Sequence, residues 1–195
     1  MSAAPAIGPE SVSSASATPG TPAAAGPPPV ILVMGVSGSG KTTVGTLLAE
    51  RLGWRYAEAD DFHPAANVAK MHAGHPLDDA DRAPWLAAIG AWIDRVSAEG
   101  VAAVVTCSAL KHEYRVILRA GRPQVRVVYL DVPSEVVAAR LRGREGHFFP
   151  AQLLESQYHD LEAPVGEEGV LCVPVAADTS PERIVDLALA AGVAR

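Results

Sequence analysis

A glycine-rich stretch near the start of the chain has the composition and spacing of a phosphate-binding loop. Residues 35–42 read GVSGSGKT and match the pattern G-x-x-x-x-G-K-[ST] at every fixed position. Glycines let backbone N–H groups converge on phosphate oxygens, and the positive end of a helix beginning near Lys41 adds to this attraction. Lys41 can then reach the β and γ phosphates of a nucleotide, and the Thr42 hydroxyl can ligate Mg²⁺. The residues expected to contact the nucleotide are Gly35, Val36, Ser37, Gly38, Ser39, Gly40, Lys41, Thr42 and Thr43.

The surroundings of this loop argue against a chance glycine-rich turn. The apolar run VILVM (30–34) precedes it, as a strand buried on both faces would, and Val44, Leu48 and Leu52 recur at helical spacing after it. No Asn-Lys-x-Asp guanine signature follows a later strand, which disfavours a switch GTPase, and motors and helicases need longer chains. The loop therefore predicts a nucleotide site but does not say where a phosphoryl group goes.

Acidic residues at the end of the second apolar run are candidates for the acceptor side. Glu58, Asp60 and Asp61 follow this run, and the carboxyl ends of parallel strands face the phosphate loop. Transfer of a phosphoryl group to an alcohol requires that the hydroxyl be oriented and its proton accepted. We expect Asp60 to do this. The alternative is helix capping before Pro64, a role that fits Asp61 better.

Histidines and an arginine follow in the same polar segment. His63, His72 and His75 have no common zinc-ligand spacing and no accompanying cysteine, so a zinc site is disfavoured. His63 is expected instead to donate a hydrogen bond to a substrate hydroxyl. Arg82 stands among acids in HPLDDADR, where it either neutralises them or binds an anionic substrate. Most of those acids could cap a helix starting at Pro84.

Further basic residues follow the third apolar run. TCSALKHEYRVILR (106–119) puts Ser108, Lys111 and Arg115 near the same sheet edge. Lys111 and Arg115 are four residues apart and so share one helical face, which suits a carboxylate or phosphate better than a dry core. A solvated helix face with basic residues is the alternative interpretation.

The segment RLRGREGHFFP (140–150) has no strand character and reads as a mobile lid. Arg140, Arg142 and Arg144 stand near two glycines in it. Arginines brought over the γ-phosphate on closure would stabilise the charge that develops there and exclude water. Arg140 is accordingly expected to contact the nucleotide and Arg144 to act in catalysis. A basic surface loop is the alternative.

Apolar runs alternate with helical patterns along the rest of the chain. Strands are predicted at 30–34, 54–59, 101–106, 125–132 and 170–175. Helices are predicted after the phosphate loop and at 64–73, 84–98, 111–120, 134–142, 150–160 and about 181–191. Such alternation with fully apolar strands is typical of an α/β fold, in which helices cover both faces of a parallel sheet.

Composition limits the class of protein. The 195 residues carry a formal net charge of −6 without a basic block, which argues against a nucleic-acid partner. No apolar run approaches the ~20 residues that cross a bilayer, so no membrane partner is expected. Residues 1–28, rich in Ala, Pro and Ser, resemble no signal peptide and should form a disordered tail before one domain at 29–195. Cys107 and Cys172 lie in apolar runs and read as buried thiols.

Taken together, four segments resemble the gluconokinase family of small P-loop kinases. They are MGVSGSGKTT, DDFHPAANVAKMHAGHPLDDADRAPWL, CSALKHEYRVILR and REGHFFPAQLLESQYHDLE. The resemblance spans about residues 29–190. It implies the P-loop NTP hydrolase fold of shikimate and nucleoside-monophosphate kinases, with a five-stranded parallel sheet and a lid segment. It also implies a cytoplasmic homodimer that uses ATP and Mg²⁺ to phosphorylate the 6-hydroxyl of D-gluconate, giving 6-phospho-D-gluconate and ADP.

The resemblance also implies roles for individual residues. Lys41 and Thr42 would serve ATP and Mg²⁺, Asp60 and His63 the sugar-acid site, and Arg144 the lid. His147 of the GHFF motif would contact the substrate. The gluconate carboxylate would be bound by one of three basic residues, which the sequence does not distinguish: Arg82, Lys111 and Arg115.

One departure from the family pattern concerns the end of the second strand. The family usually has Asp-Gly-Asp where this chain has Glu58-Ala59-Asp60. Glu58 carries its carboxylate about one methylene further out, so that a hold on Mg²⁺ through water would be repositioned. Two other functions stay open from the sequence: a kinase for another small hydroxy acid such as shikimate, and a non-catalytic nucleotide sensor.

Overall fold

The structure is a computed structural model that describes residues 26–142 and 151–195. Most of the expected tail (1–28) and the greater part of the expected lid lie outside the described residues. Two residues with expected roles, Arg144 and His147, also lie outside them.

Five strands form one parallel sheet in the order β2-β3-β1-β4-β5. They are β1 (Val30–Met34), β2 (Arg55–Glu58), β3 (Ala103–Cys107), β4 (Val125–Asp131) and β5 (Val170–Pro174). The central strands β1 and β3 are buried along their whole length, as expected for apolar strands covered on both faces. The predicted five-stranded parallel sheet is confirmed, with strand limits that differ from the predicted ones by at most two residues.

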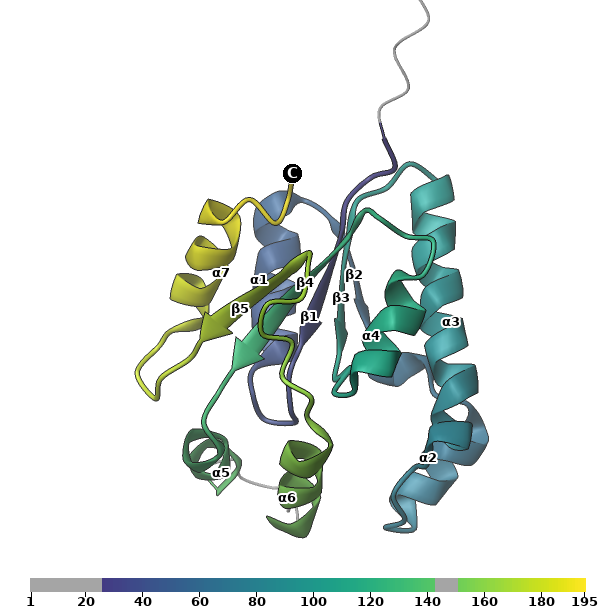
Figure 1. Cartoon of the computed structure of the whole chain (residues 1–195), viewed down its shortest axis with the longest axis vertical. Helices are drawn as coiled ribbons and strands as arrows, with labels where there is room; N and C mark the ends of the chain where they lie inside the picture. Colours follow the sequence, from purple (N-terminus) through teal and green to yellow (C-terminus); the bar gives the residue numbers. More distant parts are fainter. Residues whose placement is uncertain (1–25, 143–150) are drawn as a thin grey trace, which may run out of the picture.

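Helices cover both faces of the sheet (Figure 1). They are α1 (Lys41–Leu52) and α7 (Pro181–Ala190) on one face and α3 (Asp79–Ala98) and α4 (His112–Arg119) on the other. Side chains alternate between the faces along a strand. Ile31 and Val33 of β1 therefore join the core under α1 and α7, whereas Leu32 and Met34 join the core under α3 and α4.

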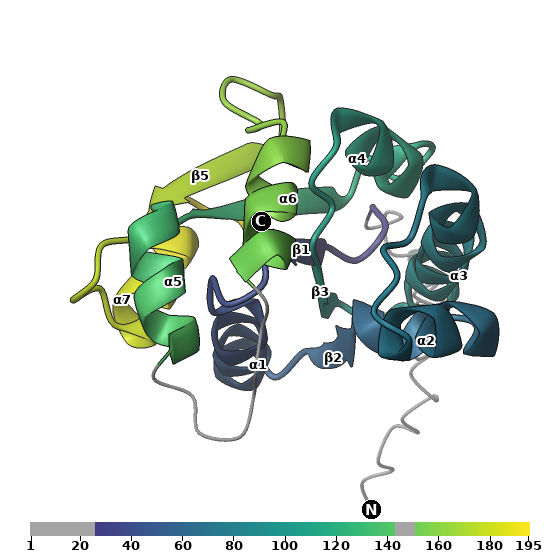
Figure 2. The same ribbon diagram turned by 90° about the horizontal axis from the view of Figure 1, so that it is seen from below.

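The remaining helical segments lie at the edge where the strands end, which Figure 2 shows from below. They are the 3₁₀ helix η1 (Ala59–Phe62), α2 (Ala65–His72), α5 (Ser134–Arg142) and α6 (Ala151–Asp160). Strand β1 has β3 on one side and β4 on the other, so the strand order reverses there. Ligands of open α/β sheets bind outside the carboxyl ends of the strands at such a point.

Helix α3 begins earlier than predicted. It starts at Asp79, whereas the sequence pattern indicated a start at Pro84. Asp78 accepts a hydrogen bond from the N–H of Asp81 at 2.9 Å, and the Asp81 carboxylate accepts one from the N–H of Asp78 at 2.9 Å. This capping box fixes the start of the helix. Pro84 consequently lies inside α3, and Asp78 and Asp81 cap the helix at its start, more than one residue position before Pro84.

Gly45 allows α1 to lie close against the sheet. A Cβ atom at this position would lie 2.5 Å from Cγ2 of Thr106 and 3.1 Å from Cε2 of Tyr56. Glycine inside a helix costs roughly 0.5–1 kcal/mol relative to alanine, and here the close approach requires it. The position of α1, and with it the helix end that follows the phosphate loop, is therefore set by contact with β2 and β3.

Within residues 26–142 and 151–195, no helix is both long and apolar enough to span a membrane. Cys107 is buried and Cys172 is half-buried, and both are free thiols.

Candidate active site

The loop between β1 and α1 turns tightly at its glycines. Gly35, Gly38 and Gly40 have φ angles of +149°, +79° and +103°, in the range that favours glycine. A Cβ atom at Gly35 would lie 2.8 Å from Oγ of Ser39 and 3.2 Å from the carbonyl oxygen of Leu130. The loop therefore consists of closely wrapped backbone at the start of a helix, the arrangement that binds phosphate oxygens through N–H groups.

Polar side chains lie within and beside this loop. Lys41 Nζ donates a hydrogen bond to the carbonyl oxygen of Val36 at 3.0 Å, so the ammonium group folds over the loop. Arg140 of α5 donates to the carbonyl oxygen of Ser39 at 3.0 Å. The Ser39 hydroxyl oxygen is buried and has no hydrogen-bond partner among the described atoms. Thr42, the second residue of α1, is exposed.

Gln157 of α6 contacts the loop from across the sheet edge. The N–H of Ser37 donates to Gln157 Oε1 at 2.6 Å, and Gln157 Nε2 donates to Ser37 Oγ at 2.9 Å. Sequence reasoning did not single out Gln157, because it is 120 residues from Ser37 and belongs to no local motif. The contact adds a residue of α6 to the donor half of the site.

Strand register brings the donor and acceptor halves of the site together. Met34 of β1 lies opposite Cys107 of β3, and Glu58 of β2 lies opposite Thr106. The chain leaves the sheet immediately after these positions. Ser108 therefore follows β3 between the start of the phosphate loop on one side and the start of η1 on the other.

The charged groups that act on the Cys107 thiol come from both sides of this sheet edge. Burial raises the pKa of the Cys107 thiol to about 12, while a hydrogen bond from the backbone of Ala109 and the positive charge of Lys41 act to lower it. The negative charges of Asp60 and Glu58 act to raise the same pKa. The end of β3 consequently lies within electrostatic reach of Lys41 and of Asp60.

Asp60 and His63 lie on the acceptor side, next to Trp85. Asp60 is exposed in η1, whose first residue, Ala59, accepts a hydrogen bond from Trp85 Nε1 at 2.7 Å. The His63 ring stacks on Trp85 with ring centroids 4.6 Å apart. Burial lowers the pKa of His63, the positive charge of Arg82 lowers it further, and Asp60 opposes both. A neutral imidazole at pH 7 follows, so one ring nitrogen is a donor and the other an acceptor.

Arg82 and Lys111 join one polar cluster from different elements. Arg82 of α3 donates a hydrogen bond to Tyr114 Oη at 3.0 Å, and that hydroxyl donates to Asp79. Lys111 Nζ lies 2.7 Å from Oδ1 of Asp79. Hydrogen bonds from Lys111 and then from Tyr114 lower the pKa of Asp79. Two expected substrate-binding residues are thus brought together, and Tyr114, which the sequence analysis did not name, connects them.

Glu58 is held in place by two hydroxyl groups. Its carboxylate accepts a hydrogen bond from Tyr56 Oη at 2.7 Å and another from Thr106 Oγ1. Thr106 is fully buried beneath α1, close to Gly45. The carboxylate is therefore fixed at the ends of β2 and β3, near the helix that carries Thr42.

Known proteins resemble this chain over most of its length. The family model described as shikimate kinase matches residues 37–162. A gluconokinase of Gluconobacter oxydans is 52% identical over 146 residues, which cover 75% of this chain and 82% of that protein. The crystal structure of a gluconokinase from Sinorhizobium meliloti 1021 is 44% identical, has a TM-score of 0.76 and covers 86% of this chain and 93% of that one. The chain belongs to the gluconokinase family.

A further solved structure has similar overlap. A sugar kinase from Janibacter sp. HTCC2649 is 45% identical, with a TM-score of 0.77, covering 84% of this chain and 94% of that chain. Membership of the gluconokinase family makes this chain an enzyme, a kinase with a P-loop nucleotide site. The family resemblance and the α/β P-loop fold predicted from the sequence are both confirmed.

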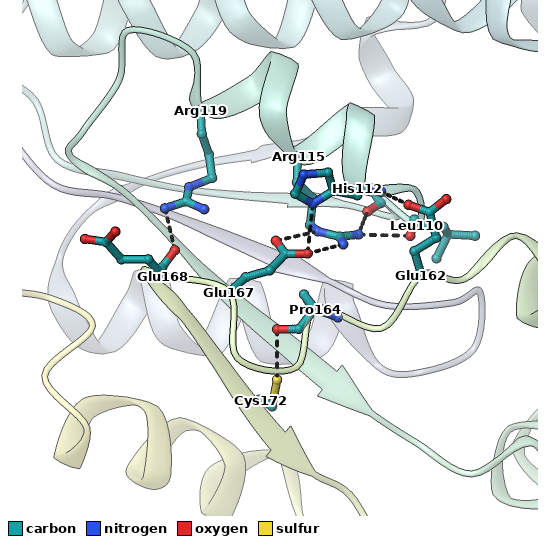
Figure 3. A network of polar contacts seen from close by, with 10 residues as sticks. Leu110, His112, Arg115, Arg119, Glu162, Pro164, Glu167, Glu168 and Cys172 are labelled. Carbon is teal, nitrogen blue, oxygen red and sulfur yellow. Dashed lines mark hydrogen bonds and ion pairs between the residues drawn. The ribbon is translucent and has the colours of Figure 1, made fainter.

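One expected site residue of the gluconokinase motifs has a different environment from the one predicted. Arg115 was expected to share a ligand-facing helical surface with Lys111, but its side chain is only 1% exposed. Its guanidinium group pairs with Glu167 and donates to the carbonyl oxygens of Ala109 and Leu110 at 3.1 and 2.9 Å (Figure 3). The four-residue spacing did not predict this, because Arg115 lies on the buried side of α4, whereas Lys111 is the N-cap residue that precedes the helix. The prediction that Arg115 faces a ligand is therefore wrong.

The remaining expectations for the gluconokinase-family site concern residues outside the described part and metal ions. Arg144 and His147 lie outside the described residues. His72 and His75 are exposed. In the part of the chain that the structure describes, no group of three or more His, Cys, Asp and Glu side chains could hold a metal ion.

Proposed function

We propose that the chain transfers the γ-phosphoryl group of ATP to the 6-hydroxyl of D-gluconate, giving 6-phospho-D-gluconate and ADP. The observation that carries this proposal is the strand register, which places the phosphate loop after β1 and η1 after β2 on either side of the end of β3, so that Lys41 and Asp60 lie at the same sheet edge. A proposed phosphate-binding lysine and a proposed proton acceptor therefore lie at the edge of the sheet where the strands end. The relative from Gluconobacter oxydans, named gluconokinase, and the gluconokinase structure from Sinorhizobium meliloti support the choice of acceptor.

The donor half of the proposal rests on residues that fit a nucleotide bound with a metal ion. The tight backbone of the glycine loop, the unpartnered Ser39 hydroxyl and the nearby Arg140 suit the phosphates. When bound, ATP with Mg²⁺ supplies the phosphoryl group and neutralises part of its charge. The Thr42 hydroxyl is the proposed ligand for Mg²⁺, and Glu58 would hold that ion through a water molecule.

The acceptor half of the proposal assigns a task to each polar group. Asp60 orients the acceptor hydroxyl and takes its proton as the oxygen forms a bond to phosphorus and the bond to ADP breaks. Neutral His63, fixed against Trp85, donates a hydrogen bond to a hydroxyl of the sugar acid. Arg82 and Lys111 supply the positive charge for the carboxylate. Lys41 stabilises the charge on the transferred group.

The substrate is tested by measuring ADP release over a panel of sugar acids and hydroxy acids. D-Gluconate should give ADP and an equal amount of a phosphorylated product, whose ³¹P–¹³C coupling in NMR places the phosphate on carbon 6. Shikimate belongs in the panel because the shikimate kinase model matches residues 37–162. Turnover of shikimate or another acid without turnover of gluconate would overturn the proposed substrate.

Two controls separate the proposal from the alternatives with other activities. ADP release without any acceptor would indicate an ATPase. Binding of ATP without ADP release for any acid would favour a nucleotide sensor. Lys41→Met should remove most turnover, because the β and γ phosphates lose their positive partner.

The oligomeric state and the location in the cell stay predictions. The family resemblance implies a homodimer in the cytoplasm. Light scattering of the purified protein tests the first, and a molar mass twice the 20.2 kDa of the chain is expected. Fractionation of the source cells tests the second.

A further inference from the structure

An ion pair between buried Arg115 and half-buried Glu167 lies behind the turn that joins β3 to α4. Arg115 Nε donates to Glu167 Oε2 at 3.1 Å, and a second guanidinium nitrogen donates to Glu167 Oε1. The third, Nη1, donates to the carbonyl oxygens of Ala109 and Leu110 at 3.1 and 2.9 Å. Figure 3 shows the guanidinium group between Glu167 and Leu110. The Arg115 side chain is 1% exposed. Each of its three nitrogens donates a hydrogen bond, either to the Glu167 carboxylate or to a carbonyl oxygen of the turn.

The turn itself has a backbone conformation that its sequence does not favour. Ala109 has a φ angle of +42° and is the one non-glycine residue with positive φ in the part of the chain that the structure describes. Left-handed conformations are disfavoured for alanine by contact of Cβ with the backbone. Such a residue persists where the surroundings hold it, and these residues cluster at functional sites. Arg115 contributes two hydrogen bonds to this turn, one to each of the carbonyl oxygens of Ala109 and Leu110.

The turn lies between the two halves of the active site. Ser108 precedes Ala109 and follows β3, next to the phosphate loop and η1. Lys111, two residues after Ala109, pairs with Asp79 in the acceptor cluster. A change in the φ angle of Ala109 would move Ser108 and Lys111 relative to each other, because they stand on opposite sides of it.

Glu167 belongs to the segment 161–169, which follows α6 and makes further hydrogen bonds to the turn and to the start of α4. The N–H of Glu162 donates to the carbonyl oxygen of Leu110 at 3.0 Å, and the Glu162 carboxylate accepts from the N–H of His112 at 2.5 Å. His112 Nδ1 lies 3.1 Å from Oε1 of Glu167. The Arg115 and His112 hydrogen bonds lower the pKa of Glu167, so it is a carboxylate at neutral pH. The turn is thus held from two sides by charged partners.

We propose that Arg115 and Glu167 are positioning residues, which hold the left-handed turn at Ala109 and thereby set Ser108 and Lys111 against the acceptor. This inference rests on the proposed kinase function and adds to it a pair that touches neither nucleotide nor substrate. It also gives Arg115 a reason to be present in the interior, where an unpaired charge would be strongly destabilising.

The test combines a weakened ion pair with relief of the strain at Ala109, and it reads acceptor kcat/KM separately from nucleotide affinity. Arg115→Lys keeps the charge but cannot contact Glu167 and both carbonyl groups at once. It should lower kcat/KM for the acceptor about 10- to 100-fold, the cost of misplacing groups by about 1 Å, with little change in the Kd of a non-hydrolysable ATP analogue. Adding Ala109→Gly should restore most of the loss, because glycine adopts positive φ without being held. Ala109→Gly alone should be close to wild type.

Arg119→Lys is the matched control. Arg119 is on the same helix, one turn later, and donates to the carbonyl oxygen of Glu168 in the same segment, but does not touch the turn. Its variant should leave kcat/KM for the acceptor unchanged. Failure of Ala109→Gly to rescue, inactivity of Ala109→Gly alone, or an equal loss in Arg119→Lys would each overturn the proposal.

A second readout does not depend on the substrate. Hydrogen–deuterium exchange of the peptide covering residues 107–112 should be faster in Arg115→Lys than in the wild type and unchanged in Arg119→Lys. If the wild type turned over no acid, the proposed function would fail while this exchange measurement still tested the pair. Unchanged exchange in Arg115→Lys would show that the pair does not hold the turn.

Discussion

The carboxamide of Gln157 is paired with Ser37 through both of its ends. Oε1 accepts the backbone N–H of Ser37 at 2.6 Å, and Nε2 donates to the hydroxyl of the same residue at 2.9 Å. The N–H groups of such a loop are the donors that bind phosphate oxygens. Gln157 therefore occupies a donor that a bound nucleotide could use, and it does so from α6, which directly follows the expected lid segment.

Replacement of Gln157 should strengthen nucleotide binding. In the wild type, a phosphate oxygen that binds the N–H of Ser37 must first displace the Gln157 side chain. In Gln157→Ala this N–H makes no hydrogen bond with residue 157, so nothing has to be displaced. A net hydrogen bond contributes about 1 kcal/mol, so the Kd of a non-hydrolysable ATP analogue should fall about fivefold. Isothermal titration calorimetry measures this. Gln157→Glu should weaken binding, because its carboxylate repels phosphate, and weaker binding in Gln157→Ala would show that Gln157 instead holds the loop in its binding form.

Loss of the Asp60 carboxylate should depress the chemical step. Asp60→Asn keeps the size of the side chain but cannot accept the hydroxyl proton, so kcat should fall about 10²- to 10⁴-fold. Affinity for the ATP analogue should change little, because Asp60 belongs to the acceptor side. Steady-state kinetics and calorimetry check both parts. Asp61→Asn, next to it in η1 and also exposed, is the control and should stay active. Near-normal kcat in Asp60→Asn would transfer the proton-accepting role to another group, with Glu58 the next candidate.

Of Arg82 and Lys111, which together supply positive charge, Arg82 is the one that we expect to contact the acceptor carboxylate directly. Lys111 is ion-paired with Asp79, whereas Arg82, within residues 26–142 and 151–195, has no carboxylate within 4 Å and donates to the neutral Tyr114 hydroxyl. A hydrogen bond to a charged group contributes about 1.5–3 kcal/mol, so Arg82→Gln should raise KM for the acceptor about 10- to 100-fold.

The control for this prediction lies on the same helix. Arg95 is exposed in the last turn of α3, and Arg95→Gln should leave KM for the acceptor unchanged. A small effect on kcat in Arg82→Gln would indicate binding that is equal in the ground state and the transition state. If Lys111→Gln raised KM more than Arg82→Gln did, the carboxylate contact would belong to Lys111.

Gly45→Ala should destabilise the fold even though alanine favours helices. The added methyl group would meet Thr106 and the Tyr56 ring, and overpacking of this kind costs about 1–3 kcal/mol. That cost exceeds the helix-propensity gain. Urea denaturation followed by circular dichroism measures it. Glu50→Ala, exposed on the same helix, should change the free energy of unfolding by less than about 0.5 kcal/mol, and equal effects in the two variants would contradict the packing argument.

The stability of the protein should depend on pH through His63. Burial lowers the folded-state pKa of His63 from its ordinary value of 6.5, so the unfolded chain binds the proton more tightly. Stability from this source is present above pH 6.5 and is lost as the pH falls toward and through the folded-state pKa. His63→Gln should therefore show a smaller loss of Tm on acidification than the wild type.

The matched control for this measurement is His75→Gln. His75 is exposed, and its variant should keep the pH dependence of Tm seen in the wild type. An identical dependence in the wild type and in His63→Gln would show that burial of the imidazole does not contribute.

Contiguous motifs in the chain were sufficient to predict the fold and to place the glycine loop between β1 and α1. The glycine loop can be recognised because its backbone shape requires glycine at fixed intervals, and Lys41 and Thr42 follow it directly. The alternation of apolar strands and amphipathic helices predicted the parallel sheet, because the spacing of apolar residues along an element indicates which of its sides are buried. Asp60 could be named for the same reason, because it follows the end of a strand.

Tertiary packing alone decided the partners that are distant along the chain. Gln157 meets Ser37 across 120 residues, and Arg115 meets Glu167 across 52, contacts that no local pattern encodes. The spacing of Lys111 and Arg115 indicated that they share a helical side but not which way that side turns. The packing of α4 against the sheet and the segment 161–169 set that direction, so Lys111 lies in the acceptor cluster and Arg115 in the interior. Sequence determines local conformation and chemistry, whereas the direction of each side chain follows from what the whole fold brings against it.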